Sequence, residues 1–281
     1  MSPCNAPTSM LESNYPTNRR PLTTTVLSMH TQTKLYEGKA KVLFADRDES
    51  TLIQYFKDDT TAFNGKKHAV IDGKGIVNNH ISAKLFATLG TAGIPHHFIA
   101  RLDDRQQRIR HCQIIPIEVV VRNVVAGSLT KLLTKGTPLT PPLLEYYLKD
   151  DTLGDPLINK AHIRVLGLAD DAEMNTIEEV ALATNTHLTQ LFASIDLVLV
   201  DFKLEFGRPK HPKPHEATLM IADEISPDSC RLWDATTGEV KDKDRFRHDL
   251  GDLMTGYQDI ADRLDGIKTE TKTKPRQPAC V

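Results

Sequence analysis

Charged and apolar residues alternate in the segment from Leu199 to Gly207, LVDFKLEFG. Successive side chains of an extended strand point to opposite faces, so Asp201, Lys203 and Glu205 are predicted to share one face. One interpretation is a solvated outer face whose charges form cross-strand ion pairs. The other is a face that binds a metal ion and phosphate groups.

A second acidic segment favours the metal-binding interpretation. Asp223 and Glu224 end an apolar stretch, ATLMIADEIS, that follows Glu205 closely in the chain. An antiparallel neighbouring strand would bring Asp223 beside Glu205. Magnesium is held by a small number of carboxylates together with phosphate oxygens. We therefore expect Glu205 and Asp223 to bind Mg²⁺ and, through it, ATP.

The segment Gly38-Lys39-Ala40-Lys41 lies between two strand-like runs. A tight turn there would present backbone N–H groups and two ammonium groups to a triphosphate. The same string also occurs in solvated hairpins, and it is neither a Walker A loop nor a dinucleotide-binding fingerprint. By itself it is weak support for a phosphate site.

Two charged residues interrupt the apolar run IPIEVVVRNVVAGS, which ends at Ser128. Glu118 and Arg122 would lie on a buried strand, where an unpaired charge is costly, so each needs a partner or a ligand. A guanidinium group offers two parallel donors to a phosphate. Arg122, Ser128 and Arg231 are therefore predicted to bind a phosphate.

The bulk composition excludes some classes of function. The 281 residues carry 35 Lys and Arg against 37 Asp and Glu, so no overall field attracts nucleic acid or an anionic membrane. No apolar run is long enough to span a bilayer. The four cysteines lie far apart, as expected of reduced thiols in a cytoplasmic protein, and the histidines show no metal-site spacing.

The pattern of apolar residues predicts mixed strands and helices without strict βαβ alternation, which is an α+β fold. Strands are expected over residues 34–44, 51–56, 114–125 and 197–202. Residues 217–226 and 232–234 are expected to form two further strands joined by a Pro-Asp turn. Helices are expected over residues 78–90, 175–195 and 244–264. The polar segment 58–65 is interpreted as a loop.

Both ends of the chain differ in residue composition from the part between them. Residues 1–33 are rich in Ser, Thr, Pro and Asn and are interpreted as a disordered extension. A targeting segment or an over-long start, with Met29 as the true first residue, are the alternatives. Residues 266–281 are interpreted as a flexible tail, which leaves residues 34–265 as the folded part.

Together these motifs resemble the family of SAICAR synthases, which are phosphoribosylaminoimidazole-succinocarboxamide synthases. The resemblance rests on IPIEVVVRNVVAGS, LVDFKLEFG and DEISPDSCRLWD, and on KLYEGKAK, FNGKKHAVIDGKGIVNN, PPLLEYYLKDD and DKDRFR. These segments run in the family's order from Lys34 to Leu264. The resemblance implies an ATP-grasp-related α+β fold with two subdomains of antiparallel sheet and packed helices. Residues 34–113 would bind ATP, residues 114–265 would hold metal and substrate, and the active site would lie in the cleft between them.

The resemblance implies a reaction of purine biosynthesis. ATP, the carboxyaminoimidazole ribonucleotide (CAIR) and L-aspartate would give SAICAR, ADP and phosphate, by way of an acyl phosphate. The alternatives are a related ATP-dependent kinase or ligase that acts on another nucleotide-like substrate, and a catalytically inactive nucleotide-binding module. Cytoplasmic location is expected, and assembly into a homo-oligomer is left open.

The resemblance also implies roles for individual residues. The ATP phosphates would be held by Gly38, Lys39, Ala40 and Lys41, with Lys203 facing the phosphates and Glu205 and Asp223 binding Mg²⁺. The ribonucleotide would be held by Arg122, Ser128 and Arg231 at its phosphate and by Glu118 near its imidazole. Three basic residues, Lys149, Lys243 and Arg247, would close over the substrates. Asn64 is given no role, because the family varies at that position.

Overall fold

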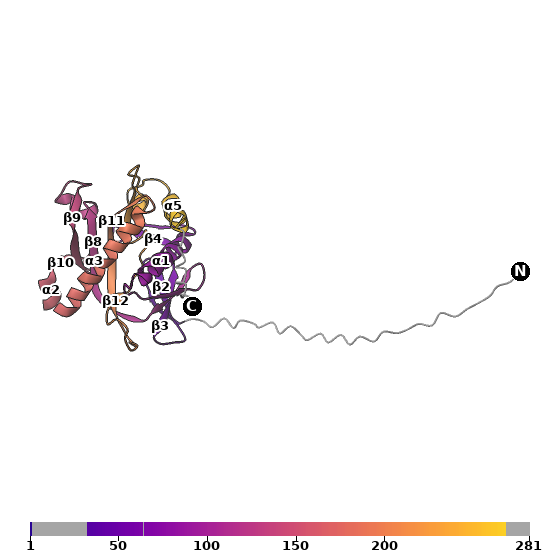
Figure 1. The fold of residues 1–281 in the computed structure, drawn as a ribbon, viewed down its shortest axis with the longest axis horizontal. Helices are drawn as coiled ribbons and strands as arrows, with labels where there is room; N and C mark the ends of the chain where they lie inside the picture. Colours follow the sequence, from indigo (N-terminus) through magenta and orange to yellow (C-terminus); the bar gives the residue numbers. More distant parts are fainter. Residues whose placement is uncertain (2–32, 64, 268–281) are drawn as a thin grey trace, which may run out of the picture. The chain divides into compact units, whose positions relative to one another are not determined.

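The computed structural model describes residues 1, 33–63 and 65–267. The predicted extension 1–33 and tail 266–281 therefore lie almost wholly outside the described residues. Within these ranges the chain forms two larger antiparallel sheets, one two-stranded hairpin and the helices that cover them (Figure 1).

The first sheet has the strand order β1-β2-β3-β7-β6 and is antiparallel throughout. Its strands are β1 (Lys34–Glu37), β2 (Lys41–Ala45), β3 (Thr51–Phe56), β6 (Phe98–Arg101) and β7 (Gln106–Arg110). The predicted strands 34–44 and 51–56 are confirmed. The GKAK segment forms the tight turn between β1 and β2, where the Gly38 N–H donates to the Lys41 carbonyl over 2.8 Å.

Helix α1 (Lys74–Thr91) confirms the predicted helix 78–90 and begins one turn earlier. Ile81, Leu85 and Leu89 follow one face of this helix at intervals of four residues, and all three are buried. Helix α1 packs against α5 (Leu253–Asp265), so the last helix of the chain lies beside the first.

The second sheet has the order β10-β9-β8-β11-β12, with β13 also pairing to β11. Its strands are β8 (Cys112–Val124), β9 (Pro138–Leu148), β10 (Leu157–Ile158), β11 (Leu197–Pro209), β12 (Met220–Ile221) and β13 (Cys230–Asp234). Helix α3 (Asp171–Ala193) packs on β8 and β11 and confirms the predicted helix 175–195. Asp170 caps α3 by accepting from the Glu173 N–H. The short helices η1 (Gly127–Lys131) and α2 (Lys160–Val165) complete this part.

The predicted pairing of residues 217–226 with 232–234 is wrong. Both segments pair with β11 instead, β12 opposite Phe206 and Gly207 and β13 opposite residues 197–202. Strand β11 has thirteen residues, so it can accept two short partners one after the other. The Pro-Asp turn therefore connects two positions along β11.

Two other expectations are corrected. The predicted helix 244–264 is divided into α4 (Asp244–Arg247) and α5, because Gly251 takes a positive φ of 98° and Asp252 begins a new helix as its N-cap. The predicted loop 58–65 contains a strand, β4 (Asp59–Ala62), which pairs with β5 (Lys67–Val70).

The boundary predicted near residue 113 coincides with the passage of the chain from the first sheet to the second. The packing of α5 on α1 ties the C-terminal part back to the N-terminal part, so the division into two subdomains stays a prediction. Among the described residues, no helix has the length and apolar character needed to cross a membrane.

Candidate active site

A cavity of about 460 Å³ opens over the central strands of the second sheet. Strands β8 and β11 form its floor, the β4–β5 hairpin and Lys39 line one side, and the segment 228–231 with Lys243 and Arg247 lines another. The predicted residues in its lining are Lys39, Glu118, Arg122, Ser128, Lys203, Arg231, Lys243 and Arg247. Most residues predicted to bind substrate or phosphate therefore share one cavity.

Strand register brings the predicted metal ligands together around Lys203. Glu118 of β8 lies directly opposite Glu205 of β11, and the Ala222 N–H donates to the Glu205 carbonyl over 2.9 Å, which places Asp223 next to Glu205. Lys203 Nζ is 2.6 Å from Glu205 Oε1, 2.9 Å from Glu118 Oε1 and 3.3 Å from Asp223 Oδ2. One ammonium group thus faces three carboxylates.

Two further lysines join this cluster from outside β11. Lys149 Nζ, at the end of β9, is 2.8 Å from Glu205 Oε1. Lys41, at the start of β2, pairs with Asp223 and lies 3.7 Å from Glu224 Oε1. The turn predicted to hold ATP phosphates is therefore joined to the predicted metal ligand Asp223.

Electrostatics keep this cluster charged. Burial alone would raise the pKa of Asp223, but Lys41 and Lys203 hold that pKa well below its usual value. Burial would likewise lower the pKa of Lys203, but Glu205, Asp223 and Glu118 raise it well above the ordinary value. Lys203 and Asp223 are therefore held in their charged forms at neutral pH.

The carboxylates of this cluster can hold a hard divalent cation only together with water or phosphate oxygens as further ligands. Among residues 33–63 and 65–267, no group of three or more His, Cys, Asp or Glu is arranged to hold a metal. Glu205 and Asp223 nevertheless share Lys203, and beside them Glu224 has a buried Oε2 without a hydrogen-bond partner in the described part of the chain. Such an oxygen set suits Mg²⁺, which keeps water and phosphate oxygens among its ligands.

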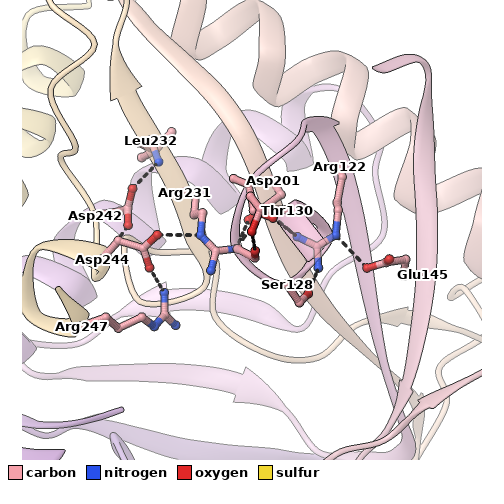
Figure 2. A network of polar contacts seen from close by, with 12 residues as sticks. Arg122, Ser128, Thr130, Glu145, Asp201, Arg231, Leu232, Asp242, Asp244 and Arg247 are labelled. Atoms are coloured by element: carbon pink, nitrogen blue, oxygen red, sulfur yellow. Dashed lines mark hydrogen bonds and ion pairs between the residues drawn. The ribbon is translucent and has the colours of Figure 1, made fainter. Parts of the chain in front are cut away.

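Arginines and carboxylates alternate along the other half of the cavity (Figure 2). The chain of ion pairs runs in the order Glu145, Arg122, Asp201, Arg231, Asp244 and Arg247. Each contact in it measures 2.6–3.0 Å between nitrogen and oxygen. Arg122 also donates to Ser128 Oγ over 3.0 Å. The predicted phosphate-binding residues are thus neighbours, because Asp201 joins Arg122 to Arg231 and Arg122 contacts Ser128.

Gly127 lets the backbone approach Arg231 closely. A Cβ atom at Gly127 would lie 2.7 Å from Arg231 Nη2, and its φ of +53° is strained for other residues. Gly136 offers a matched control, since its φ is +84° but nothing lies within 4 Å of its Cβ position.

We expect Gly127→Ala and Gly136→Ala to lose a similar stability, about 1–2 kcal/mol, from the backbone strain alone. Gly127→Ala should in addition raise the KM for a phosphorylated substrate, because the new methyl group displaces Arg231. Denaturant unfolding and steady-state kinetics on both variants measure the two effects. Equal KM values in the two variants would contradict a role of Gly127 in positioning Arg231.

The sequence analysis did not predict a buried group of polar side chains next to the cavity, formed by Lys74, Asp228 and Tyr257. Lys74 Nζ lies 2.6 Å from Asp228 Oδ2, and the Tyr257 hydroxyl donates to Asp228 Oδ1 over 2.6 Å. Lys74 and Tyr257 are fully buried. Asp228 lies in the SPDSCR motif, but nothing in the sequence indicates its pairing with residues so far away in the chain.

The family model described as SAICAR synthetase matches residues 34–264. A protein of Bartonella henselae named phosphoribosylaminoimidazole-succinocarboxamide synthase is 48% identical over 255 residues, 90% of this chain and 100% of that protein. One of the same name from Novosphingobium aromaticivorans is 53% identical over 244 residues, 86% of this chain and 93% of that protein.

Solved structures of similar proteins have the same fold. The crystal structure of phosphoribosylaminoimidazole-succinocarboxamide synthase from Ehrlichia chaffeensis superposes with a TM-score of 0.80 at 44% identity and covers 84% of this chain and 100% of its own. A SAICAR synthetase in complex with ADP gives a TM-score of 0.78 at 46% identity, covering 84% of this chain and 99% of its own. The residues matched by the family model, 34–264, include all those that line the cavity.

Proposed function

Because the chain belongs to the SAICAR synthetase family, we propose that this cavity is where it joins CAIR to L-aspartate. The enzyme is an ATP-dependent carbon–nitrogen ligase of purine biosynthesis, and its products are SAICAR, ADP and phosphate. The expected family, fold class and activity are confirmed, and the inactive module and the kinase of another substrate are set aside.

The observation that best supports this use of the cavity is the division of β11 into two charged regions. Lys203 and Glu205 belong to the lysine–carboxylate cluster, which is the group of Lys41, Lys149 and Lys203 with Glu118, Glu205 and Asp223. Asp201 belongs to the arginine chain, which is the row of ion pairs that runs from Glu145 to Arg247. These residues share one face of a strand, so Asp201 and Glu205 are about 13 Å apart along it. A triphosphate and a ribonucleotide phosphate can therefore bind side by side.

Nucleotide binding is assigned to the first region. The turn from Gly38 to Lys41 offers its N–H groups and the Lys39 and Lys41 ammonium groups to the phosphates of ATP. Glu205 and Asp223 would hold Mg²⁺, and the metal would supply positive charge against the crowded phosphates. The similar solved structure of a SAICAR synthetase in complex with ADP supports nucleotide binding by this chain.

The ribonucleotide is assigned to the second region. Arg122 and Arg231 both pair with Asp201, Arg122 donates to Ser128 Oγ, and all three residues line the cavity, where guanidinium and hydroxyl donors suit a phosphate. Glu118 lines the same cavity 2.9 Å from Lys203 Nζ, and it is assigned to the imidazole ring.

The chemistry requires activation of a carboxylate, because a carboxylate is a poor acyl donor. An oxygen of the CAIR carboxylate attacks the terminal phosphorus of ATP and ADP leaves, which gives an acyl phosphate. The aspartate amine then attacks the acyl carbon, the new C–N bond forms, the C–O bond to phosphate breaks and the amine releases a proton. Lys203 and Lys149 offset the negative charge that collects between the reactants.

Partners and location follow from the same assignment. The partners are three small charged substrates, without nucleic acid or membrane. Within the described residues, Cys112 and Cys230 form no disulfide, which suits the reducing cytoplasm.

Purified protein with Mg-ATP, CAIR and L-aspartate should release ADP only when all three substrates are present. Product absorbance should rise with ADP, and L-glutamate should not replace L-aspartate. ADP release that does not depend on aspartate would instead indicate a kinase. Absence of ADP release under all conditions would contradict the proposed use of this cavity.

A further inference from the structure

Asp242 lies next to the arginine chain and has no assigned contact with substrate. It is the first residue of the segment DKDRFR, in which only Lys243 and Arg247 were predicted to contact substrates. Asp242 is fully buried between β13 and α4, and it does not line the cavity. Its carboxylate forms no ion pair within residues 33–63 and 65–267. A buried carboxylate without a cationic partner is costly, so its local contacts must offset that cost.

The two oxygens of Asp242 bind two backbone N–H groups. Oδ2 accepts from the Leu232 N–H and Oδ1 accepts from the Asp244 N–H, each over 2.8 Å (Figure 2). The Leu232 carbonyl in turn accepts from the Lys241 N–H over 2.9 Å. The Asp242 side chain thus extends the pairing of this segment with β13 and joins β13 to the start of α4.

Both N–H groups lie at the ion pair between Arg231 and Asp244. Leu232 follows Arg231 directly in β13, and Asp244 Oδ2 is 2.8 Å from Arg231 Nε. Asp244 Oδ1 accepts from Arg247 at the same time. Asp242 therefore fixes the backbone at both partners of the ion pair, and a shift of either partner would move the Arg231 guanidinium within the cavity.

The negative charge of Asp242 allows both N–H groups to be held at once. An ionised carboxylate accepts through both oxygens, whereas an amide has one accepting oxygen and presents N–H donors at the other position. Burial and the charge of Asp244 raise the pKa of Asp242 to about 7, while the two backbone N–H groups and Arg231 lower it. The neutral amide of an Asn would therefore be easier to bury, but it could hold only one of the two N–H groups.

We propose that Asp242 is a positioning residue for the ribonucleotide site, which holds Leu232 and Asp244 so that Arg231 is aligned with the substrate phosphate. Asp242 touches no substrate and acts through Arg231. A displacement of about 1 Å in a binding group can slow a reaction about 100-fold, so alignment of this kind has a measurable effect. The inference rests on the proposed function, because that function assigns Arg231 to the ribonucleotide phosphate.

The test compares Asp242→Asn with Asp234→Asn. Asp234 also lies in β13 and also accepts from two backbone N–H groups, those of Thr236 and Thr237, neither of which lines the cavity. Asp242→Asn should raise the KM for the ribonucleotide about 10- to 100-fold, while the KM values for ATP and L-aspartate change less than about twofold. Its kcat/KM for the riboside without phosphate should equal that of the wild type. Asp234→Asn should keep the wild-type KM for the ribonucleotide.

A double variant shows whether Asp242 acts through Arg231. In the Arg231→Met protein the aligned group is gone, so adding Asp242→Asn should lower kcat/KM for the ribonucleotide by less than about twofold more. A full additional loss in the double variant would overturn the proposal. Equal slowing of the ribonucleotide and the riboside by Asp242→Asn would overturn it too, because that result is expected of a residue that serves only the fold.

Ribose 5-phosphate gives a measurement on the wild-type protein that needs no turnover. Its binding, followed by calorimetry, should slow hydrogen exchange at the amides of Leu232 and Asp244, because a bound phosphate stiffens the ion pair beside them. The amides of Thr236 and Thr237 should exchange at unchanged rates. Absence of binding, or equal exchange with and without ribose 5-phosphate at all four amides, would overturn the proposal even if Asp242→Asn does not fold. If ribose 5-phosphate gives the expected protection but no ADP forms with aspartate, the proposed function fails and the positioning role stands.

Discussion

Glu205→Gln should lower kcat about 100- to 1,000-fold while the protein stays folded. The substitution keeps the shape of the side chain and removes the charge that is assigned to Mg²⁺. Glu205 is buried, and it faces both Lys203 at 2.6 Å and Lys149 at 2.8 Å. The neutral amide would leave these two ammonium groups with one carboxylate fewer, so the site would bind a divalent cation poorly.

The measurement is a magnesium titration of turnover, with the melting temperature recorded on the same samples. The Mg²⁺ concentration for half-maximal rate should rise in Glu205→Gln, and part of the lost rate should return at high Mg²⁺. Glu179→Gln, an exposed glutamate of α3, provides the control and should behave as the wild type. A lowered melting temperature with unchanged turnover would mean that Glu205 serves only the ion-pair cluster.

The alternation in LVDFKLEFG was sufficient to predict a strand with Asp201, Lys203 and Glu205 on one face. It could not separate their roles, because those depend on which neighbouring strand lies opposite each residue. Asp201 lies opposite Arg122 and Arg231, whereas Glu205 lies opposite Glu118. The interpretation as an ion-paired face therefore describes the part of the strand around Asp201. The interpretation as a ligand-binding face describes the part around Glu205.

Contacts between residues that lie far apart in the chain could not be predicted from the sequence. Lys74 and Asp228 are separated by 154 residues, and no local pattern connects them. Strand β9 was missed because its prolines, including Pro141 and Pro142, are unusual within a strand. Segments with strong periodicity, such as α1 and α3, were predicted well because one buried face determines their pattern.

The arginine chain also explains how so many charges can be buried beside the cavity. Asp201 lies between Arg122 and Arg231, and Asp244 lies between Arg231 and Arg247, so each acid serves two guanidinium groups. The cavity lining holds six basic residues, Lys39, Arg122, Lys203, Arg231, Lys243 and Arg247, against three acids, Glu118, Asp201 and Asp228. The local excess of positive charge suits an anionic ligand and fixes its position before it binds.

Arg231→Met should lower kcat/KM for the ribonucleotide about 100- to 1,000-fold, since it removes charge-assisted donors from the phosphate. The fold should persist, because Asp201 keeps Arg122 and Asp244 keeps Arg247 as partners. The KM for L-aspartate should stay nearly constant, because Arg231 is assigned to the ribonucleotide phosphate. Arg263→Met is the matched control, because Arg263 also pairs with two carboxylates, Asp234 and Asp259, but does not line the cavity.

The decisive comparison uses the riboside that lacks the phosphate group. The wild type should prefer the ribonucleotide strongly over the riboside, because Arg122, Ser128 and Arg231 have no ligand in the riboside complex. Arg231→Met should lose most of that preference, whereas Arg263→Met should keep it and lose only stability. If Arg231→Met slows both substrates by the same factor, Arg231 acts by positioning Asp201 and Asp244, and the phosphate contact must be assigned to Arg122 and Ser128 alone.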